Sequence, residues 1–215
     1  MLSPQHPGSG WLIDYACGNL SPSFELVIAT HLLSCTACRE ELAVAEHLGA
    51  DLMLTPTALV PTLTADDILH STRATPQDLV SRLPQPLSPA LDLTGWVSRY
   101  LRISLPALRW RTAAGIAIAK LRDDKGDRLW LLRAPPGTVL PRHTHRGAEL
   151  TLVLQGAYVI GDQLFAEGAL EDADEETIHQ PIVTTRGECL CLAATMGPLQ
   201  FDSWAARIAG RVLGI

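Results

Sequence analysis

The chain has 215 residues, of which 47% are apolar and 19% are charged, a composition that excludes an intrinsically disordered protein. Its net charge of −6 argues against a nucleic-acid-binding surface built on bulk positive charge, so we expect no direct nucleic acid binding. Uncharged, proline-free runs are shorter than the roughly 18 apolar residues that a membrane span needs, and residues 1–11 lack the features of a signal peptide. We therefore expect a soluble, cytoplasmic protein that does not bind a membrane.

Charge divides the sequence into two parts. Residues 1–70 contain one basic residue against eight acidic residues, a balance of −7, whereas residues 71–215 carry 16 basic and 15 acidic residues. Such asymmetry indicates two modules with different partners. Residues 72–94 hold four prolines, which remove backbone donors and disfavour a continuous helix or strand. We predict two domains, 1–71 and 95–215, joined by a proline-rich linker at 72–94.

The first module has the pattern of a small all-helical domain. A short amphipathic stretch at 11–16 ends at a glycine–asparagine pair, which favours the end of a helix. Ser21 before Pro22 is a favourable start for a second helix, whose apolar residues recur as far as Gly49. An acidic first turn predicts a further short helix at 64–69.

Beyond the linker, short apolar or alternating runs are separated by turn residues. Many short strands at nearly even spacing are typical of a β-barrel or β-sandwich, and residues 203–213 could add a final helix. The fold class predicted for the whole chain is α+β, with a helical domain followed by an antiparallel β-barrel. The predicted strands are 115–121, 128–133, 149–154, 157–160, 182–185 and 189–194.

Three residues of the predicted second helix form a candidate metal site. At about 100° per residue, His31, Cys35 and Cys38 lie within roughly 60° of one another on a helix. Two thiolates and an imidazole suit Zn²⁺, which takes four ligands in a tetrahedron. A thioredoxin-like redox pair is an alternative for the two cysteines, although no βαβ pattern precedes them. A third interpretation is two small apolar residues and a capping histidine.

A fourth zinc ligand must come from elsewhere in the chain. His6 precedes the first predicted helix, and an antiparallel return from that helix would bring it beside the second. His47 and Cys17 are the alternatives.

The order of these residues resembles the zinc-binding anti-sigma domain. His6, then 24 residues, then His31-x3-Cys35-x2-Cys38 stand in an acidic module of the corresponding size. The resemblance implies a zinc-dependent inhibitor of a group IV (extracytoplasmic function) sigma factor that blocks its binding to RNA polymerase. An acidic module would also be attracted to the basic surfaces of a sigma factor. Alternatively, the acidic surface serves solubility alone.

A second constellation lies in the predicted barrel. Gly137-x5-His143-x-His145-x3-Glu149-x6-Gly156 has the spacing of the first cupin motif, and the module is identified as a member of the cupin family. In a strand, the two histidines point to one face, and the glutamate returns from the turn to the same interior side. The resemblance predicts a barrel of the cupin type.

The cupin resemblance implies that His179 completes a metal site with His143, His145 and Glu149. Three imidazoles and a carboxylate suit zinc or another divalent transition metal. The second cupin motif departs from the family pattern here, because acidic residues at 172–176 replace the usual glycine and proline, and no asparagine follows His179.

Cys189 and Cys191 are two of the five cysteines and form a candidate redox-sensing pair. Residues two apart in a strand point to one face, but a disulfide between them would be strained. They could equally be buried apolar residues, the commonest state of free cysteine.

Together the two modules resemble the ChrR type of anti-sigma factor over residues 6–70 and approximately 100–200. That resemblance implies a stress-response regulator of transcription rather than an enzyme. The first module would hold the sigma factor inactive, and the cupin would respond to singlet oxygen or a related oxidant by releasing it. We hypothesise that oxidation of a ligand, the metal or the cysteine pair changes how the cupin packs against the first module or the linker.

The alternative function is a metal-dependent cupin enzyme of the dioxygenase or isomerase type, since a metal with open coordination positions can activate oxygen or a carbonyl. Near His143 and His145 the sequence offers no obvious further acid or base besides Arg146. A metal-storage or small-molecule-binding module is a third possibility without distinguishing residues.

Overall fold

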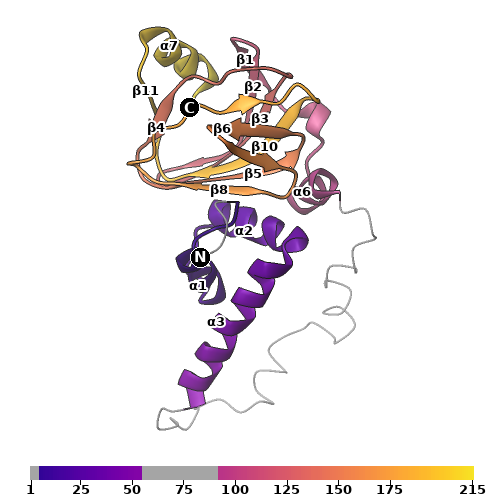
Figure 1. Cartoon of the computed structure of the whole chain (residues 1–215), viewed down its shortest axis with the longest axis vertical. Helices are drawn as coiled ribbons and strands as arrows, with labels where there is room; N and C mark the ends of the chain where they lie inside the picture. Colours follow the sequence, from indigo (N-terminus) through magenta and orange to yellow (C-terminus); the bar gives the residue numbers. More distant parts are fainter. Residues whose placement is uncertain (1–4, 55–91) are drawn as a thin grey trace. The chain divides into compact units, whose positions relative to one another are not determined.

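The computed structural model describes residues 5–54 and 92–215 (Figure 1). The N-terminal part is helical, as predicted, and contains α1 (Ser9–Ala16), α2 (Pro22–Ser34) and α3 (Thr36–Leu54). The helix predicted at 64–69 lies outside the described residues, as does the predicted linker except for its last three residues. Two of those three begin the helix α6 (Leu93–Leu101), which is capped by the carboxylate of Asp92.

The prediction of one continuous helix from Pro22 to Gly49 was wrong. Cys35 has an extended backbone, with φ −100° and ψ 106°, and separates α2 from α3. The side chain of Arg39 donates to the carbonyl of Leu32 at 2.6 Å and to that of Leu33 at 3.3 Å. These bonds satisfy carbonyls that a helix end leaves unpaired, so α2 can stop without losing hydrogen bonds.

The remaining chain is mainly antiparallel β-structure, introduced by a 3₁₀ helix, η1 (Leu105–Ala107), and followed by α7 (Trp204–Leu213). The final helix is confirmed, and Ser203 caps it by accepting from the backbone of Ala206. The strands are β1 (Arg111–Ala113), β2 (Ile116–Asp124), β3 (Asp127–Ala134), β4 (His143–His145), β5 (Glu149–Gln155), β6 (Ala157–Ile160), β7 (Gln163–Ala166), β8 (Leu170–Ala173), β9 (Ile182–Val183), β10 (Cys189–Thr195) and β11 (Leu199–Phe201).

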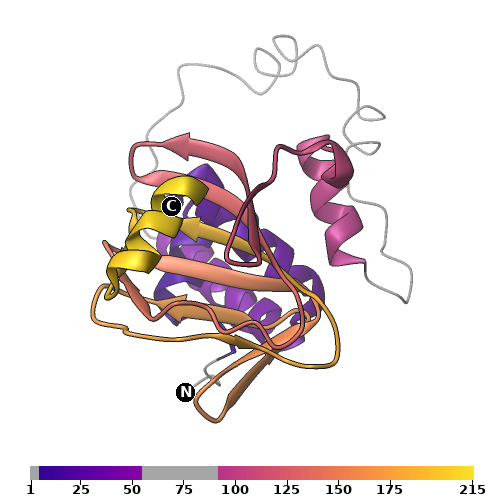
Figure 2. The same ribbon diagram turned by 90° about the horizontal axis from the view of Figure 1, so that it is seen from above.

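The strands form three antiparallel sheets, in the orders β1-β2-β3-β10-β5-β8, β11-β4 and β7-β6-β9. They enclose a common core in a cupin-like arrangement rather than closing into one continuous ladder (Figure 2). The α+β fold class is therefore confirmed. The sequence did not reveal β1, β7, β8 and β11, each of which is three or four residues long.

The middle of the largest sheet, around β10, is buried on both faces. Along β10, Cys189, Cys191 and Ala193 belong to the barrel core. The alternate residues Leu190 and Leu192 are also buried, and α2 contacts this sheet through β3, β5 and β10. Figure 1 shows α2 beside the sheet. Burial on both faces explains why β10 is apolar throughout instead of alternating.

The barrel also provides the N-terminal cap of α2. Ser21 occupies the cap position, as predicted, but its side chain makes no cap bond. Instead, Asp127 at the start of β3 accepts hydrogen bonds from Ser21 Oγ at 2.8 Å and from the backbone N–H of Ser23 at 3.1 Å. A carboxylate at this position satisfies a free donor and complements the helix dipole.

Residues 5–46 and 92–215 accordingly belong to one compact unit, whereas the end of α3, from His47 onward, belongs to a second. The domain boundaries at 71 and 95 stay predictions. No helix among the described residues combines the length and apolar character that a membrane span requires.

Candidate metal centres

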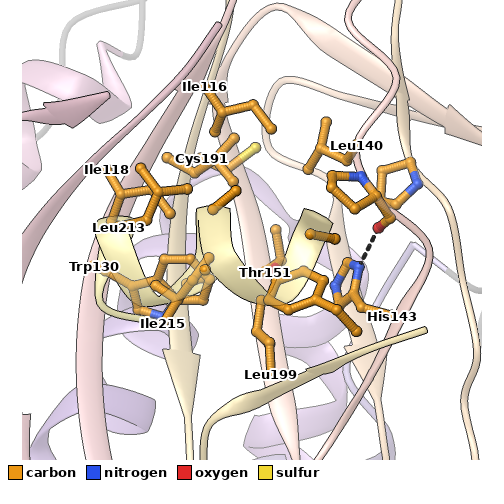
Figure 3. A pocket seen from close by; sticks show the side chains of 18 of the residues that line it. Ile116, Ile118, Trp130, Leu140, His143, Thr151, Cys191, Leu199, Leu213 and Ile215 are labelled. Atoms are coloured by element: carbon orange, nitrogen blue, oxygen red, sulfur yellow. Dashed lines mark hydrogen bonds between the residues drawn. The ribbon is translucent and has the colours of Figure 1, made fainter. Parts of the chain in front are cut away.

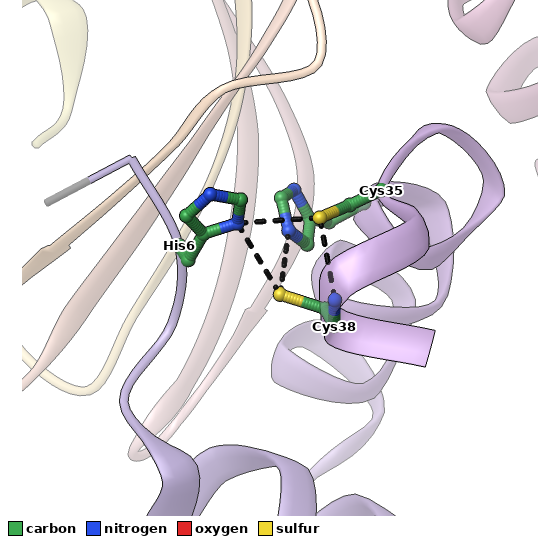
Figure 4. A group of neighbouring side chains, drawn as sticks. His6, Cys35 and Cys38 are labelled. Atoms are coloured by element: carbon green, nitrogen blue, oxygen red, sulfur yellow. Dashed lines mark hydrogen bonds between the residues drawn. The ribbon is translucent and has the colours of Figure 1, made fainter. Parts of the chain in front are cut away.

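The first candidate site lies where the segment before α1 meets the junction of α2 and α3. The structure brings His6, His31, Cys35 and Cys38 together, with one potential ligand atom of each within 4.8 Å of the others (Figure 4). His6 Nδ1 lies 3.2 Å from Cys35 Sγ and 3.4 Å from Cys38 Sγ, and His31 Nε2 lies 3.3 Å from Cys38 Sγ. Cys17, an alternative fourth ligand, is exposed and does not belong to this group.

These distances fit a tetrahedral zinc site. Zinc bonds of about 2.0 Å to nitrogen and about 2.3 Å to sulfur place neighbouring nitrogen and sulfur ligands about 3.5 Å apart. The break at Cys35 contributes to this geometry, because Cys35 Sγ accepts from the backbone N–H of Cys38 at 3.4 Å in the first turn of α3. A helix N-terminus also favours the thiolate form that zinc requires.

The protonation states at the first site also suit a metal. Burial lowers the pKa of His31 to about 4, against the effect of its hydrogen bond to Gly168, so the imidazole is neutral at pH 7. Its Nδ1 donates to the carbonyl of Gly168 at 2.9 Å, which leaves Nε2 to face Cys38. Burial and the neighbouring Cys35 raise the pKa of Cys38 to about 12. The thiolate of Cys38 therefore requires a cation beside it.

The second candidate site lies inside the barrel. His143 and His145 point inward from β4, Glu149 begins β5, and all three are at most 5% exposed. His179 lies directly opposite His143, and their backbones exchange hydrogen bonds of 3.1 Å in both directions. One potential ligand atom of each of the four residues lies within 4.8 Å of the others. The structure thus brings His179 to the predicted place despite the divergent motif around it.

The hydrogen bonds of the second site leave lone pairs directed at a common point. Nδ1 of His143 donates to the carbonyl of Pro141 at 2.8 Å, and Nδ1 of His179 donates to the carboxylate of Glu171. Both Nε2 atoms then carry lone pairs, and they face each other at 3.0 Å. Without a cation between them, these lone pairs would repel.

Two further buried atoms support the same conclusion. Within residues 5–54 and 92–215, His145 Nε2 lies 3.4 Å from Glu149 Oε1 without forming a hydrogen bond, and Glu149 Oε2 has no hydrogen-bond partner. Burial would raise the pKa of Glu149, but the neighbouring imidazoles hold it below its usual value, so the carboxylate is ionised. Buried polar atoms are rarely unpaired, and a divalent cation would satisfy both.

Sequence reasoning missed Glu171 and Tyr158. Glu171, on β8, is only 7% exposed; it accepts from His179 and also from the hydroxyl of Tyr158 at 2.6 Å. Burial and the charge of Glu171 raise the pKa of Tyr158 well above its usual value, so its hydroxyl stays a donor. A carboxylate behind a ligating histidine fixes the ring and its tautomer. In the sequence, Glu171 belongs to an acidic run, and nothing there distinguishes it from its exposed neighbours.

A largely apolar cavity of about 70 Å³ adjoins the second site. Figure 3 shows His143 at this cavity together with Leu140, Trp130 and Leu213, the last of which comes from α7. Cys191 also lines it, and its Sγ lies 3.6 Å from that of Cys189. Both cysteines are free and buried, and the pKa of Cys191 is raised well above its usual value by Cys189 and by burial, so its thiol is protonated.

Comparisons with known proteins agree with this architecture. The family model described as the ChrR cupin-like domain matches residues 100–199. The anti-sigma-E factor ChrR of Cereibacter sphaeroides is 36% identical over 211 residues, which cover 97% of each chain. The crystal structure of Rhodobacter sphaeroides SigE in complex with the anti-sigma ChrR matches with a TM-score of 0.69 and 35% identity, and the match covers 89% of this chain and 98% of that chain. With this identity over nearly the full length of both chains, the protein belongs to the ChrR family of anti-sigma factors.

Proposed function

We propose that the protein is a cytoplasmic anti-sigma factor that binds a group IV sigma factor through its N-terminal helices and keeps it from RNA polymerase. The observation that carries this proposal is the 36% identity to an anti-sigma factor across 97% of both chains. A match of this extent includes the helical module as well as the cupin. It therefore favours a regulator over the alternative of a cupin enzyme.

The N-terminal helices offer a suitable surface for such a partner. Leu48 and Leu52, one turn apart on α3, are 60% and 64% exposed. A row of exposed leucines on a helix is typical of a surface that binds another protein. The negative balance of residues 1–70 complements the basic surfaces with which sigma factors bind DNA.

Zinc in the first site would connect His6, ahead of α1, to the two cysteines at the α2–α3 junction. A structural zinc ion with four protein ligands contributes directly to folding stability. Here it would hold the helices in one arrangement and so define the surface offered to the sigma factor.

The barrel site would hold zinc or another divalent transition metal and make the complex responsive to an oxidant such as singlet oxygen. Three features support this role: imidazole ligands that an oxidant can attack, a neighbouring pair of thiols, and an adjoining apolar cavity. Bound there, the metal would supply a positive charge that holds the four ligands together. Damage to one ligand would disturb the strands that carry the others.

SigE of Rhodobacter sphaeroides, the partner in the matching complex, provides the probe for binding. We expect the zinc-loaded full-length chain to retain SigE in a pull-down, and Leu48→Lys and Leu52→Lys to weaken binding at least about tenfold by burying a charge. Leu164→Lys on β7, a residue that is 48% exposed, is the matched control and should bind normally. The proposal would be refuted if the chain bound neither SigE nor any member of a panel of group IV sigma factors.

A further inference from the structure

Strand β8 contacts a ligand of the barrel centre and the segment that carries His6 of the N-terminal centre. It is the last strand of the largest sheet, so one of its edges has β5 as partner and the other is free of strands. The segment before α1 lies along that free edge, where the backbone N–H of Leu170 donates to the carbonyl of Gln5 at 3.0 Å. The side chain of Gln5 also donates to the carbonyl of Leu164 in β7. These bonds fix the residue that immediately precedes the ligand His6.

The turn before β8 holds a second ligand of the same centre. The carbonyl of Gly168 accepts the Nδ1 hydrogen of His31 and so sets the tautomer in which Nε2 faces Cys38. The approach is close: a Cβ on residue 168 would lie 2.9 Å from Ser34 Oγ, and φ is +83°. Both histidines of the N-terminal site are thus positioned by β7, β8 and the turn that connects them.

The next residues of β8 alternate between the two centres. The carboxylate of Asp172 accepts from the backbone N–H of Gly8 and from Trp11 Nε1, both at 3.0 Å, and so holds the segment that follows His6. The adjacent Glu171 points into the barrel and accepts from Nδ1 of the ligand His179. Adjacent side chains on a strand point to opposite faces but share one backbone. A displacement of the Glu171 side chain therefore moves the backbone that also carries Asp172.

We propose that β8 couples the two metal centres, so that a metal in the barrel site strengthens metal binding at the N-terminal site. The proposal rests on the metal sites of the proposed function and deepens it. With a metal bound, His179 is fixed and anchors Glu171. The turn before β8 then presents Gly168, and β8 presents Asp172, in the positions that His31 and the segment around His6 require. When the barrel site is emptied or damaged, that anchor loosens, and the ligands of the N-terminal site lose their support.

Cobalt titration of the metal-free full-length chain isolates the N-terminal site. Co²⁺ bound to thiolate has a sulfur-to-metal charge-transfer absorption, and the barrel site offers no cysteine among its four clustered residues. The band therefore reports the N-terminal site alone. Glu171→Gln changes a residue whose side chain, in the described part of the chain, bonds to His179 and Tyr158 inside the barrel. We expect it to weaken Co²⁺ binding at the thiolate site about 5- to 100-fold. Asp172→Asn should weaken the same site directly.

Glu167→Gln is the matched control, since it makes the same chemical change at an exposed position in the turn between β7 and β8. It should leave the affinity of the thiolate site unchanged. If Glu171→Gln does not fold, Tyr158→Phe decides, because it removes only the hydroxyl that donates to Glu171 and should weaken the thiolate site by a smaller factor.

The coupling would be overturned if Glu171→Gln bound Co²⁺ at the thiolate site with wild-type affinity. The same result in Tyr158→Phe would overturn it where Glu171→Gln does not fold. Either result would leave both metal sites and the anti-sigma function intact. The coupling would also be overturned if Glu167→Gln weakened Co²⁺ binding at the thiolate site as much as Glu171→Gln does. Absence of the charge-transfer band from the wild-type chain would instead remove the N-terminal metal site, and the coupling with it. Binding of SigE, measured separately, tests the proposed function by itself.

Discussion

Asp127 on β3 accepts a hydrogen bond of 3.1 Å from the backbone N–H of Ser23, so the barrel caps a helix that begins 105 residues earlier at Pro22. We expect Asp127→Ala to lower the free energy of unfolding of the full chain by about 1–2 kcal/mol, because the cap is lost and Ser21 loses its partner. Chemical denaturation followed by circular dichroism measures this. Asp162→Ala, at an exposed turn residue, should change stability by less than about 0.5 kcal/mol. Equal losses of unfolding free energy in the two variants would contradict the role of Asp127 as the cap of α2.

The N-terminal metal site predicts a specific loss of zinc. Elemental analysis of Cys38→Ser should find one metal ion fewer per chain than in the wild type, because a hydroxyl does not replace a thiolate on zinc. Cys17→Ser makes the same change at an exposed cysteine outside the cluster and should leave the metal content unchanged. Full zinc retention in Cys38→Ser would exclude this cluster as the site.

Substitution of Gly156, the last glycine of the cupin motif, should strongly destabilise the fold. Its φ is +78°, and a Cβ there would lie 2.3 Å from the carbonyl oxygen of Glu188. Gly156→Ala must therefore move backbone, and we expect a loss of more than about 2 kcal/mol in unfolding free energy. Gly187→Ala, where a Cβ would meet no atom within 4 Å and φ is not positive, should cost far less. A similar loss in both proteins would contradict this explanation of the motif.

Thiol reactivity provides a prediction for all five cysteines at once. In the zinc-loaded native protein, Cys17 is exposed, Cys189 and Cys191 are buried, and zinc would protect Cys35 and Cys38. A chromogenic disulfide reagent should therefore react rapidly with one thiol per chain, and with all five after denaturation in a chelator. Rapid reaction of three or more thiols in the zinc-loaded protein would contradict either the zinc site or the burial of the β10 pair.

The proximity of most ligands could be predicted from the sequence because local geometry sets it. His143 and His145 are two residues apart on one short strand and so share a face, and Cys35 directly precedes the first turn of α3, which contains Cys38. The break of the helix at Cys35 could not be predicted in this way. Arg39 satisfies the carbonyls that the break exposes, and its presence leaves the apolar period of the sequence unchanged.

By itself, the sequence determined the helical and β-rich modules, their order and two sets of metal-binding residue types, since these depend on periodicity and short spacings. Only the tertiary structure decided that α2 covers the outer face of the barrel sheet and that Glu171 is buried behind His179. It also decided that the carbonyl of Gly168 orients His31, a contact across 137 residues. Every residue has a backbone carbonyl of the same chemistry, so which one meets a given histidine depends on how distant segments pack.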